Sequence, residues 1–142
     1  MSLETNNNPS VVNLEIPGKV LQIECGREHT LLLVQEANQG KVFSMGWGAD
    51  GQPGSGCTKN VTTPNKVLGF EDHFISAIST STDFTFALTN SGELFCWGNG
   101  EYGNNMLGSE RDKVYAASLN PPLFPKYWIS KKDSVYTFEY QI

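Results

Sequence analysis

The sequence predicts an all-β chain built from two copies of one antiparallel strand unit and part of a third. Its apolar runs are short, rich in β-branched and aromatic residues, and separated by turn residues, whereas helical periodicity is almost absent. A glycine-rich stretch at residues 41–56 recurs 52 residues later, at residues 93–108. Repeats of about 40–50 residues are typical of solenoids, propellers and arrays. A small sheet must stack on its neighbours to bury both faces, so we expect a fragment of a β-propeller, about two blades and a partial third.

The two copies match position by position. In the glycine-rich half, three glycines of the first copy fall on glycines of the second at an offset of 52: Gly40 on Gly92, Gly46 on Gly98 and Gly51 on Gly103. Upstream the offset is 55, because the turn at residues 34–40 is three residues longer than the turn at residues 89–92. A partial third copy is indicated at residues 136–140, since a threonine recurs at Thr30, Thr85 and Thr137.

The elements follow from this alignment in chain order. Residues 1–18 are expected to form a flexible lead-in, residues 19–108 two repeats, and residues 109–142 a linker and a degenerate partial third repeat. We expect strands near residues 19–24, 29–34, 41–45, 74–79, 84–89, 93–97 and 134–140. Residues 62–69 and 118–128 contain proline and are interpreted as extended linkers. Residues 109–119 are the one stretch in which we expect a short helix.

Composition and charge narrow the classes of partner. The chain has 142 residues, which suits one domain, and a net charge of −5 with a pI near 4.9. This charge argues against direct binding to nucleic acid or to an anionic membrane. No apolar run reaches the roughly 18 residues of a membrane-spanning helix. The odd set Cys25, Cys57 and Cys96 indicates a reducing compartment without a disulfide framework.

Residues 20–34 followed by residues 40–56 resemble the repeat of the regulator of chromosome condensation family. The family pattern contains a Gly-x-x-His-Thr run and then a glycine-rich hairpin ending in Gly-Gln-x-Gly, found here at residues 26–30 and 51–54. Residues 46–54 are more particularly similar to the mitochondrial member of the family. The second copy departs from the pattern, because Ser81 replaces the glycine and Phe84 replaces the histidine.

The resemblance implies a non-catalytic propeller that binds other proteins. Members of the family promote nucleotide exchange on small GTPases or act as assembly scaffolds, so the implied partner is a GTPase or a mitochondrial assembly factor. The implied location is mitochondrial, although no transit peptide is visible at the N-terminus; otherwise we expect the cytoplasm. The family builds a ring of about seven blades, so a truncated product without independent function, able to self-associate through open sheet edges, is an alternative.

The candidate site residues fall into two groups. The turns after the third strand of each copy are expected to contact a partner weakly, through Trp47, Gly48, Asp50, Gln52, Asn99, Glu101 and Tyr102. The structural repeat motif comprises Gly26, His29, Thr30, Gly46, Gly51, Gly54, Thr85, Trp97, Gly98 and Gly103. For Trp97 we favour packing between blades over an interface role, whereas Trp47 and Trp128 are as consistent with one as with the other.

An enzyme is the least favoured alternative. It would use the Cys25 thiol with His29 as its base, but a structural histidine bonded within the blade is the simpler interpretation. The turn carboxylates Asp50, Asp83 and Glu101 are expected to be solvated rather than catalytic. We expect no metal, because no second pair of ligands accompanies His29 and Cys25. We expect no cofactor, since the glycines do not form a phosphate-binding loop of the Gly-x-x-x-x-Gly-Lys type.

Overall fold

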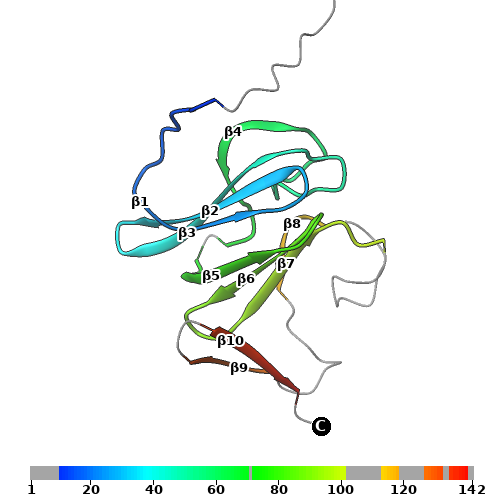
Figure 1. The fold of residues 1–142 in the computed structure, drawn as a ribbon. Helices are drawn as coiled ribbons and strands as arrows, with labels where there is room; N and C mark the ends of the chain where they lie inside the picture. The colour runs from blue at the N-terminus through cyan, green and yellow to red at the C-terminus, as the bar shows by residue number, and fades with distance from the viewer. Residues whose placement is uncertain (1–9, 71, 102–112, 119–126, 133–134, 141–142) are drawn as a thin grey trace, which may run out of the picture.

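The computed structural model describes residues 10–70 and 72–101 and, as backbone strands, residues 113–118, 127–132 and 135–140. These residues form ten strands in three antiparallel sheets (Figure 1). The first sheet has the order β1 (Lys19–Cys25), β2 (His29–Glu36), β3 (Gln39–Gly46) and β4 (Val61–Lys66). The second has the order β5 (Ile75–Thr80), β6 (Phe84–Thr89), β7 (Leu94–Gly98) and β8 (Lys113–Ser118). A hairpin of β9 (Tyr127–Lys132) and β10 (Val135–Tyr140) follows.

The strand registers repeat at the offsets read from the sequence. A register shift between Val20 and Gln22 in β1 recurs 55 residues later, between Ile75 and Ala77 in β5. A second shift, between Ser44 and Gly46 in β3, recurs 52 residues later in β7. The two sheets are therefore copies of one four-stranded unit, and the offset of 52 extends through the fourth strands, which the sequence alignment did not reach.

Seven of the ten strands agree with the expected positions, and three differ. Residues 62–66, interpreted as part of a linker, pair with β3 within the edge strand β4. Proline is tolerated there because an edge strand can leave one backbone position unpaired. The helix expected at residues 109–119 is wrong for residues 113–118, which form β8. Val114 and Tyr115 favour strand, and pairing with β7 fixes that state. Residues 127 and 128, expected in a linker, begin β9.

The turn between β2 and β3 is tighter than the sequence suggests. Glu36 pairs directly with Gln39, so only two residues lie outside the strands. Ala37 and Asn38 both have positive φ, of 47° and 64°, which is the geometry of a two-residue hairpin turn with a type I′ twist. The strands consequently run on to residue 36 and from residue 39, beyond the expected limits at 34 and 41.

The main hydrophobic core lies between the two four-stranded sheets. β5 of the second sheet contacts β1, β2 and β3 of the first (Figure 1). The core contains side chains from both sheets and from the segment that links them: Leu31, Leu33, Val42, Val67, Phe70, Ile75, Ile78, Ala87, Phe95 and Trp97. Gly40 lies so close to β5 that a methyl group there would collide with the carbonyl oxygen of Ile75. The sheets thus stack face to face, as successive blades of a propeller do.

The N-terminal segment is described from residue 10 onward. Residues 1–9 of the expected lead-in lie outside the described residues, whereas Ile16 packs against the first sheet. Among the described residues, no helix is both long and apolar enough to cross a membrane.

Candidate binding surface

Four loops at one end of the two sheets form a continuous surface. They are residues 26–28, 47–54, 81–83 and 99–101, and we call them the loop surface. The Trp47 amide donates a hydrogen bond of 2.8 Å to the Glu28 carbonyl oxygen. At the equivalent place in the second sheet, the Asn99 amide donates one of 2.9 Å to the Asp83 carbonyl oxygen. Each sheet therefore ties the loop after its third strand to the turn between its first two strands.

Further hydrogen bonds join the loops of one sheet to those of the other. The Arg27 amide donates to the Thr82 carbonyl oxygen at 2.7 Å. The Asn99 side-chain Nδ2 donates to Asp50 Oδ2 at 3.1 Å. Loops from both repeats consequently hold one another in place, and a partner would meet a single surface.

Gln52 fixes the centre of the loop surface from the protein interior. Its side chain is only 1% exposed, so it faces the protein interior. Its Nε2 donates to Asp50 Oδ2 at 3.2 Å and to Asp83 Oδ1 at 3.5 Å, and its Oε1 accepts from the Asp50 amide at 3.0 Å. The amide group is therefore satisfied by residues of both repeats, and it draws two carboxylates together.

Trp97 anchors the same loop from the second sheet. Its side chain is 0% exposed, and its Nε1 donates to the Gln52 carbonyl oxygen at 2.9 Å. The indole packs edge-on against Phe70, with ring centroids 5.5 Å apart. Ser44 adds a hydroxyl hydrogen bond to the Pro53 carbonyl oxygen. Trp97 is thus buried in the core between the two sheets; the side chain of Trp128 lies outside the described residues.

Four of the motif glycines adopt backbone geometries that other residues avoid. Gly46 and Gly98 have φ of 123° and 102°, and a methyl group would collide with the carbonyl oxygens of Glu28 and Asp83 respectively. Gly51 and Gly54 also have positive φ, while Gly103 lies outside the described residues. The glycines thus allow the close backbone approach on which the loop-to-turn hydrogen bonds depend.

His29 links the two sheets beneath the loop surface. It is buried in β2, and its Nε2 lies 3.0 Å from Thr80 Oγ1 and 3.4 Å from Thr85 Oγ1. The Thr80 hydroxyl donates to the Phe84 carbonyl oxygen at 2.9 Å, so its oxygen is left to accept a hydrogen bond from an N–H group at His29 Nε2. This arrangement favours the neutral tautomer that carries its proton at Nε2. Its Nδ1 is buried without a hydrogen-bond partner, and a methyl group at Gly26 would collide with this ring.

This environment disfavours the charged imidazolium. Burial lowers the pKa of His29 below its ordinary value of 6.5, and the charge of Asp83 opposes that shift in part. A second proton would have to bind at Nδ1, where no acceptor is available to the new N–H group.

The pKa of His29 makes the stability of the chain dependent on pH. Because the folded-state pKa is the lower one, the unfolded chain takes up a proton first when the pH falls. We expect the His29 contribution to be complete above about pH 6.5 and to decrease below it, by less than about 1.4 kcal/mol per pH unit. Urea unfolding between about pH 7.5 and about pH 5.5 measures this slope. His29→Phe, which copies the residue at the equivalent position 84, should flatten the slope; greater stability in acid would contradict this account.

Cys25 and His29 do not form a catalytic pair. Cys25 is opposite Thr30 in the β1–β2 register, so it shares a face of the sheet with Thr30, and His29 lies on the other face. The His29 Nε2 is bonded to threonine, and Nδ1 has no partner. Cys25 and Cys57 are exposed, and Cys96 is buried. The two residues that an enzyme would need to bring together are kept apart by strand alternation.

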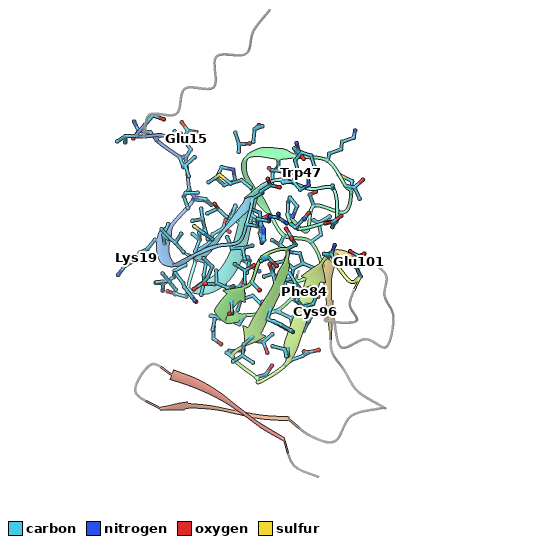
Figure 2. All side chains as sticks on the ribbon, turned by 45° about the vertical axis from the view of Figure 1, so that its right-hand side comes forward. Glu15, Lys19, Trp47, Phe84, Cys96 and Glu101 are labelled. Carbon is cyan, nitrogen blue, oxygen red and sulfur yellow. The ribbon has the colours of Figure 1, made fainter. Side chains whose placement is uncertain are left out.

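The residues expected to contact a partner lie in different environments. Trp47 is 46% exposed and Glu101 is exposed, and Figure 2 shows them in the loops after β3 and β7. Asp50 is half-buried, while Gly48 and Gln52 are buried; Tyr102 lies outside the described residues. Whether they contact a partner stays a prediction. The turn at residues 26–28 and its equivalent at residues 81–83, related by the offset of 55, were not among the expected contact residues.

The loop surface carries an excess of negative charge. Four carboxylates, Glu28, Asp50, Asp83 and Glu101, stand beside one guanidinium, Arg27. The Arg27 Nη1 atom lies 3.9 Å from Asp83 Oδ2, and its side chain is 70% exposed. Exposed ion pairs of this kind contribute about 0–1 kcal/mol. Arg27 therefore remains accessible, and the surface as a whole favours a partner that presents cations.

Comparison with known families agrees with this architecture. The family model of the regulator of chromosome condensation (RCC1) repeat matches residues 39–88, and a second model of the same repeat matches residues 75–104. The chain carries RCC1 repeats. The two matches together cover residues 39–104, which include β3 and β4 of the first sheet and β5–β7 of the second.

Curated proteins match about two thirds of this chain. The mouse RCC1-like G exchanging factor-like protein is 39% identical over 89 residues, which are 62% of this chain and 19% of the relative. The Arabidopsis thaliana ultraviolet-B receptor UVR8 is 36% identical over 96 residues, which are 68% of this chain and 21% of the relative. The chain thus spans about a fifth of the length of these relatives.

A solved structure confirms the arrangement of the RCC1 repeats. The crystal structure of human WBSCR16 superposes with a TM-score of 0.71 and 31% sequence identity, covering 80% of this chain and 28% of that chain. The two four-stranded sheets are therefore consecutive blades of an RCC1-type propeller, and the chain is of fragment size relative to the ring.

Proposed function

We propose that this chain is a non-catalytic binding module whose loop surface contacts a small GTPase and promotes release of its nucleotide. The observation that carries the proposal is the bonding of four loops from two repeats into one acidic surface with an exposed tryptophan. Tryptophan is enriched among residues that dominate binding energy, and complementary charge speeds association with a cationic partner. Part of the surface is held rigid by the buried Gln52 and Trp97 side chains, which reduces the entropy lost on binding.

The mechanism needs no reacting side chain. A module that binds the nucleotide-free GTPase more tightly than the loaded form lowers the affinity of the GTPase for nucleotide by the same factor, through linkage. A tenfold difference in affinity between the two forms corresponds to about 1.4 kcal/mol. Several loops contribute to such a difference, which suits a surface assembled from more than one repeat.

The relatives support the proposal in part and also limit it. The mouse relative is an RCC1-like G exchanging factor-like protein, whereas the Arabidopsis relative is an ultraviolet-B receptor. The relatives thus have different named roles, and a scaffold for assembly is our second candidate function. The similarity of residues 46–54 to the mitochondrial member of the family supports a mitochondrial location, which we propose together with the function.

Nucleotide release tests the proposal directly. Small GTPases loaded with fluorescent GDP are mixed with the purified chain, and both binding and the rate of GDP release are measured. We expect Trp47→Ala to weaken binding at least tenfold, because an interface tryptophan contributes about 2 kcal/mol or more. The control is Phe74→Ala, which removes an exposed aromatic residue that lies outside the loop surface.

The outcomes separate the candidate functions. Accelerated release that is lost in Trp47→Ala and kept in Phe74→Ala supports exchange at the loop surface. Saturable binding without accelerated release supports a scaffold. A chain that circular dichroism shows to be folded and that binds none of the GTPases overturns the proposal for this fragment.

A further inference from the structure

The first sheet has one fully covered face and one partly covered face. Leu31, Leu33 and Val42 project into the core shared with the second sheet. On the opposite face, Leu32, Val34 and Phe43 form a separate cluster against which Ile16 packs. The β1–β2 register adds two β1 residues to that opposite face, because Val20 is opposite Val34 and Ile23 is opposite Leu32. We call this the leading face; its apolar residues are Val20, Ile23, Leu32, Val34 and Phe43.

Part of the leading face is open to solvent. Ile23 is 61% exposed in the middle of β1, and Val20 is also exposed. Neighbouring apolar side chains exposed on a regular strand are typical of a surface that meets another protein surface.

The repeat itself identifies what such a face contacts. At the offsets of 55 and 52, four residues of the leading face correspond to residues of the second sheet: Val20 to Ile75, Ile23 to Ile78, Leu32 to Ala87 and Phe43 to Phe95. All four counterparts are buried in the core against the first sheet. The leading face of the first sheet therefore has the same apolar residue pattern as the face of the second sheet that packs on the first.

The second sheet offers that opposite side. The counterparts of Leu31, Leu33 and Val42, which cover the second sheet, are Phe86, Leu88 and Leu94. All three are half-buried and lie outside the buried core clusters. The Phe86 ring packs edge-on against Phe84, with centroids 4.9 Å apart. We call this set, Phe86, Leu88 and Leu94, the trailing face.

We propose that the trailing face of one copy of this chain docks on the leading face of a second copy, in the geometry of the interface between its two sheets, and displaces the segment around Ile16 that packs there. The two faces are the counterparts of the two sides of an interface that the chain already forms internally. Because the faces differ, the association is head-to-tail rather than symmetric, and it can continue into a ring or a chain of copies.

The docked interface lacks two polar links that the internal interface has. Within the chain, Gln22 accepts from the Ile78 amide at 3.1 Å and donates to the Ile78 carbonyl oxygen at 2.7 Å. On the trailing face, the counterpart of Gln22 is Ala77, and the counterpart of His29 is Phe84. Apolar contact is kept and these hydrogen bonds are lost, so the association is reversible and depends on concentration.

Sedimentation equilibrium of the full 142-residue chain tests the association. We expect the average mass to rise from 15.7 kDa as the concentration is raised. Ile23→Glu should abolish this rise, since it places a charge on the leading face at a side chain too exposed to matter for folding. The matched control Leu68→Glu changes an exposed leucine outside both faces and should leave the rise unchanged.

A mixing experiment tests the identity of the occupant. Leu94→Glu blocks the trailing face, and Leu94→Gln serves if circular dichroism shows that the glutamate variant is unfolded. Neither the leading-face nor the trailing-face variant should associate alone. An equimolar mixture should form dimers only, because one copy keeps its trailing face and the other its leading face.

Three results would overturn the proposal. The first is an unchanged chain that stays monomeric at all concentrations. The second is an association that Ile23→Glu does not weaken, as pairing through the loop surface would give. The third is an association that the mixture fails to restore, as symmetric pairing of two β1 edges would give.

Discussion

Trp97→Ala is expected to lower the free energy of unfolding by about 3–5 kcal/mol, which is the usual cost of truncating a buried aromatic residue. The indole fills the core between the repeats, packs on Phe70 and donates to the Gln52 carbonyl oxygen. Since domains are stable by only about 5–15 kcal/mol, we expect much of the cooperative unfolding transition to be lost. Urea unfolding followed by circular dichroism measures the change.

Trp97→Phe is the matched control for this prediction. It keeps an aromatic ring in the core and removes the hydrogen bond to Gln52, so we expect a smaller loss of about 1–3 kcal/mol. The difference between the two variants separates packing from hydrogen bonding. A loss below about 1 kcal/mol in Trp97→Ala would show that the core between the sheets does not hold them together.

Gly98→Ala is expected to cost about 2–5 kcal/mol, through backbone strain and a steric collision. Gly98 has φ of 102°, and its added methyl group would meet the Asp83 carbonyl oxygen and the Phe84 backbone. The collision involves backbone atoms, which cannot move aside as a flexible side chain can. The hydrogen bond from Asn99 to Asp83 should be lost with it, and thermal unfolding measures the combined effect.

Gly92→Ala isolates the strain from the collision. Gly92 also has positive φ, of 87°, but no heavy atom lies within 4 Å of the position of an added methyl group. We expect a cost of about 1–2 kcal/mol from φ alone. If Gly98→Ala and Gly92→Ala destabilised the chain equally, close backbone approach would not be the reason for glycine at position 98.

The repeat could be predicted because it depends on local residue preferences. Positions that require positive φ select glycine, and buried strand positions select β-branched and aromatic residues, so both recur at fixed offsets. The fourth strands could not be predicted in this way. β4 contains Pro64, and β8 follows a charged stretch that also suits a helix. Their strand state comes from pairing with β3 and β7, which is a tertiary effect.

The candidate site was predictable only in outline. The glycine-rich turns indicated two of the four loops, and the offset of 55 related the other two. The sequence could not show that Trp97 donates to the Gln52 carbonyl oxygen or that His29 contacts Thr80. The residues of these two contacts are 45 and 51 positions apart, and the contacts depend on how the two sheets stack. Trp47 is exposed and Trp97 is buried, although each lies beside a motif glycine. The local sequence therefore does not distinguish them, and the difference comes from the stacking of the two sheets.

The hydrogen bond from Trp97 to Gln52 makes the relation between the two repeats asymmetric, because a side chain of the second repeat binds a loop of the first. The loop at residues 47–54 belongs to the first repeat by sequence, but its conformation is closed by the second. Local opening of the second sheet would therefore release this loop to proteases and to hydrogen exchange, even while β1–β4 stayed paired. Loss of the first sheet would deprive Trp97 of this acceptor and expose the core residues of the second sheet. The second repeat thus covers the loop of the first, and the protection of residues 47–54 depends on the second sheet.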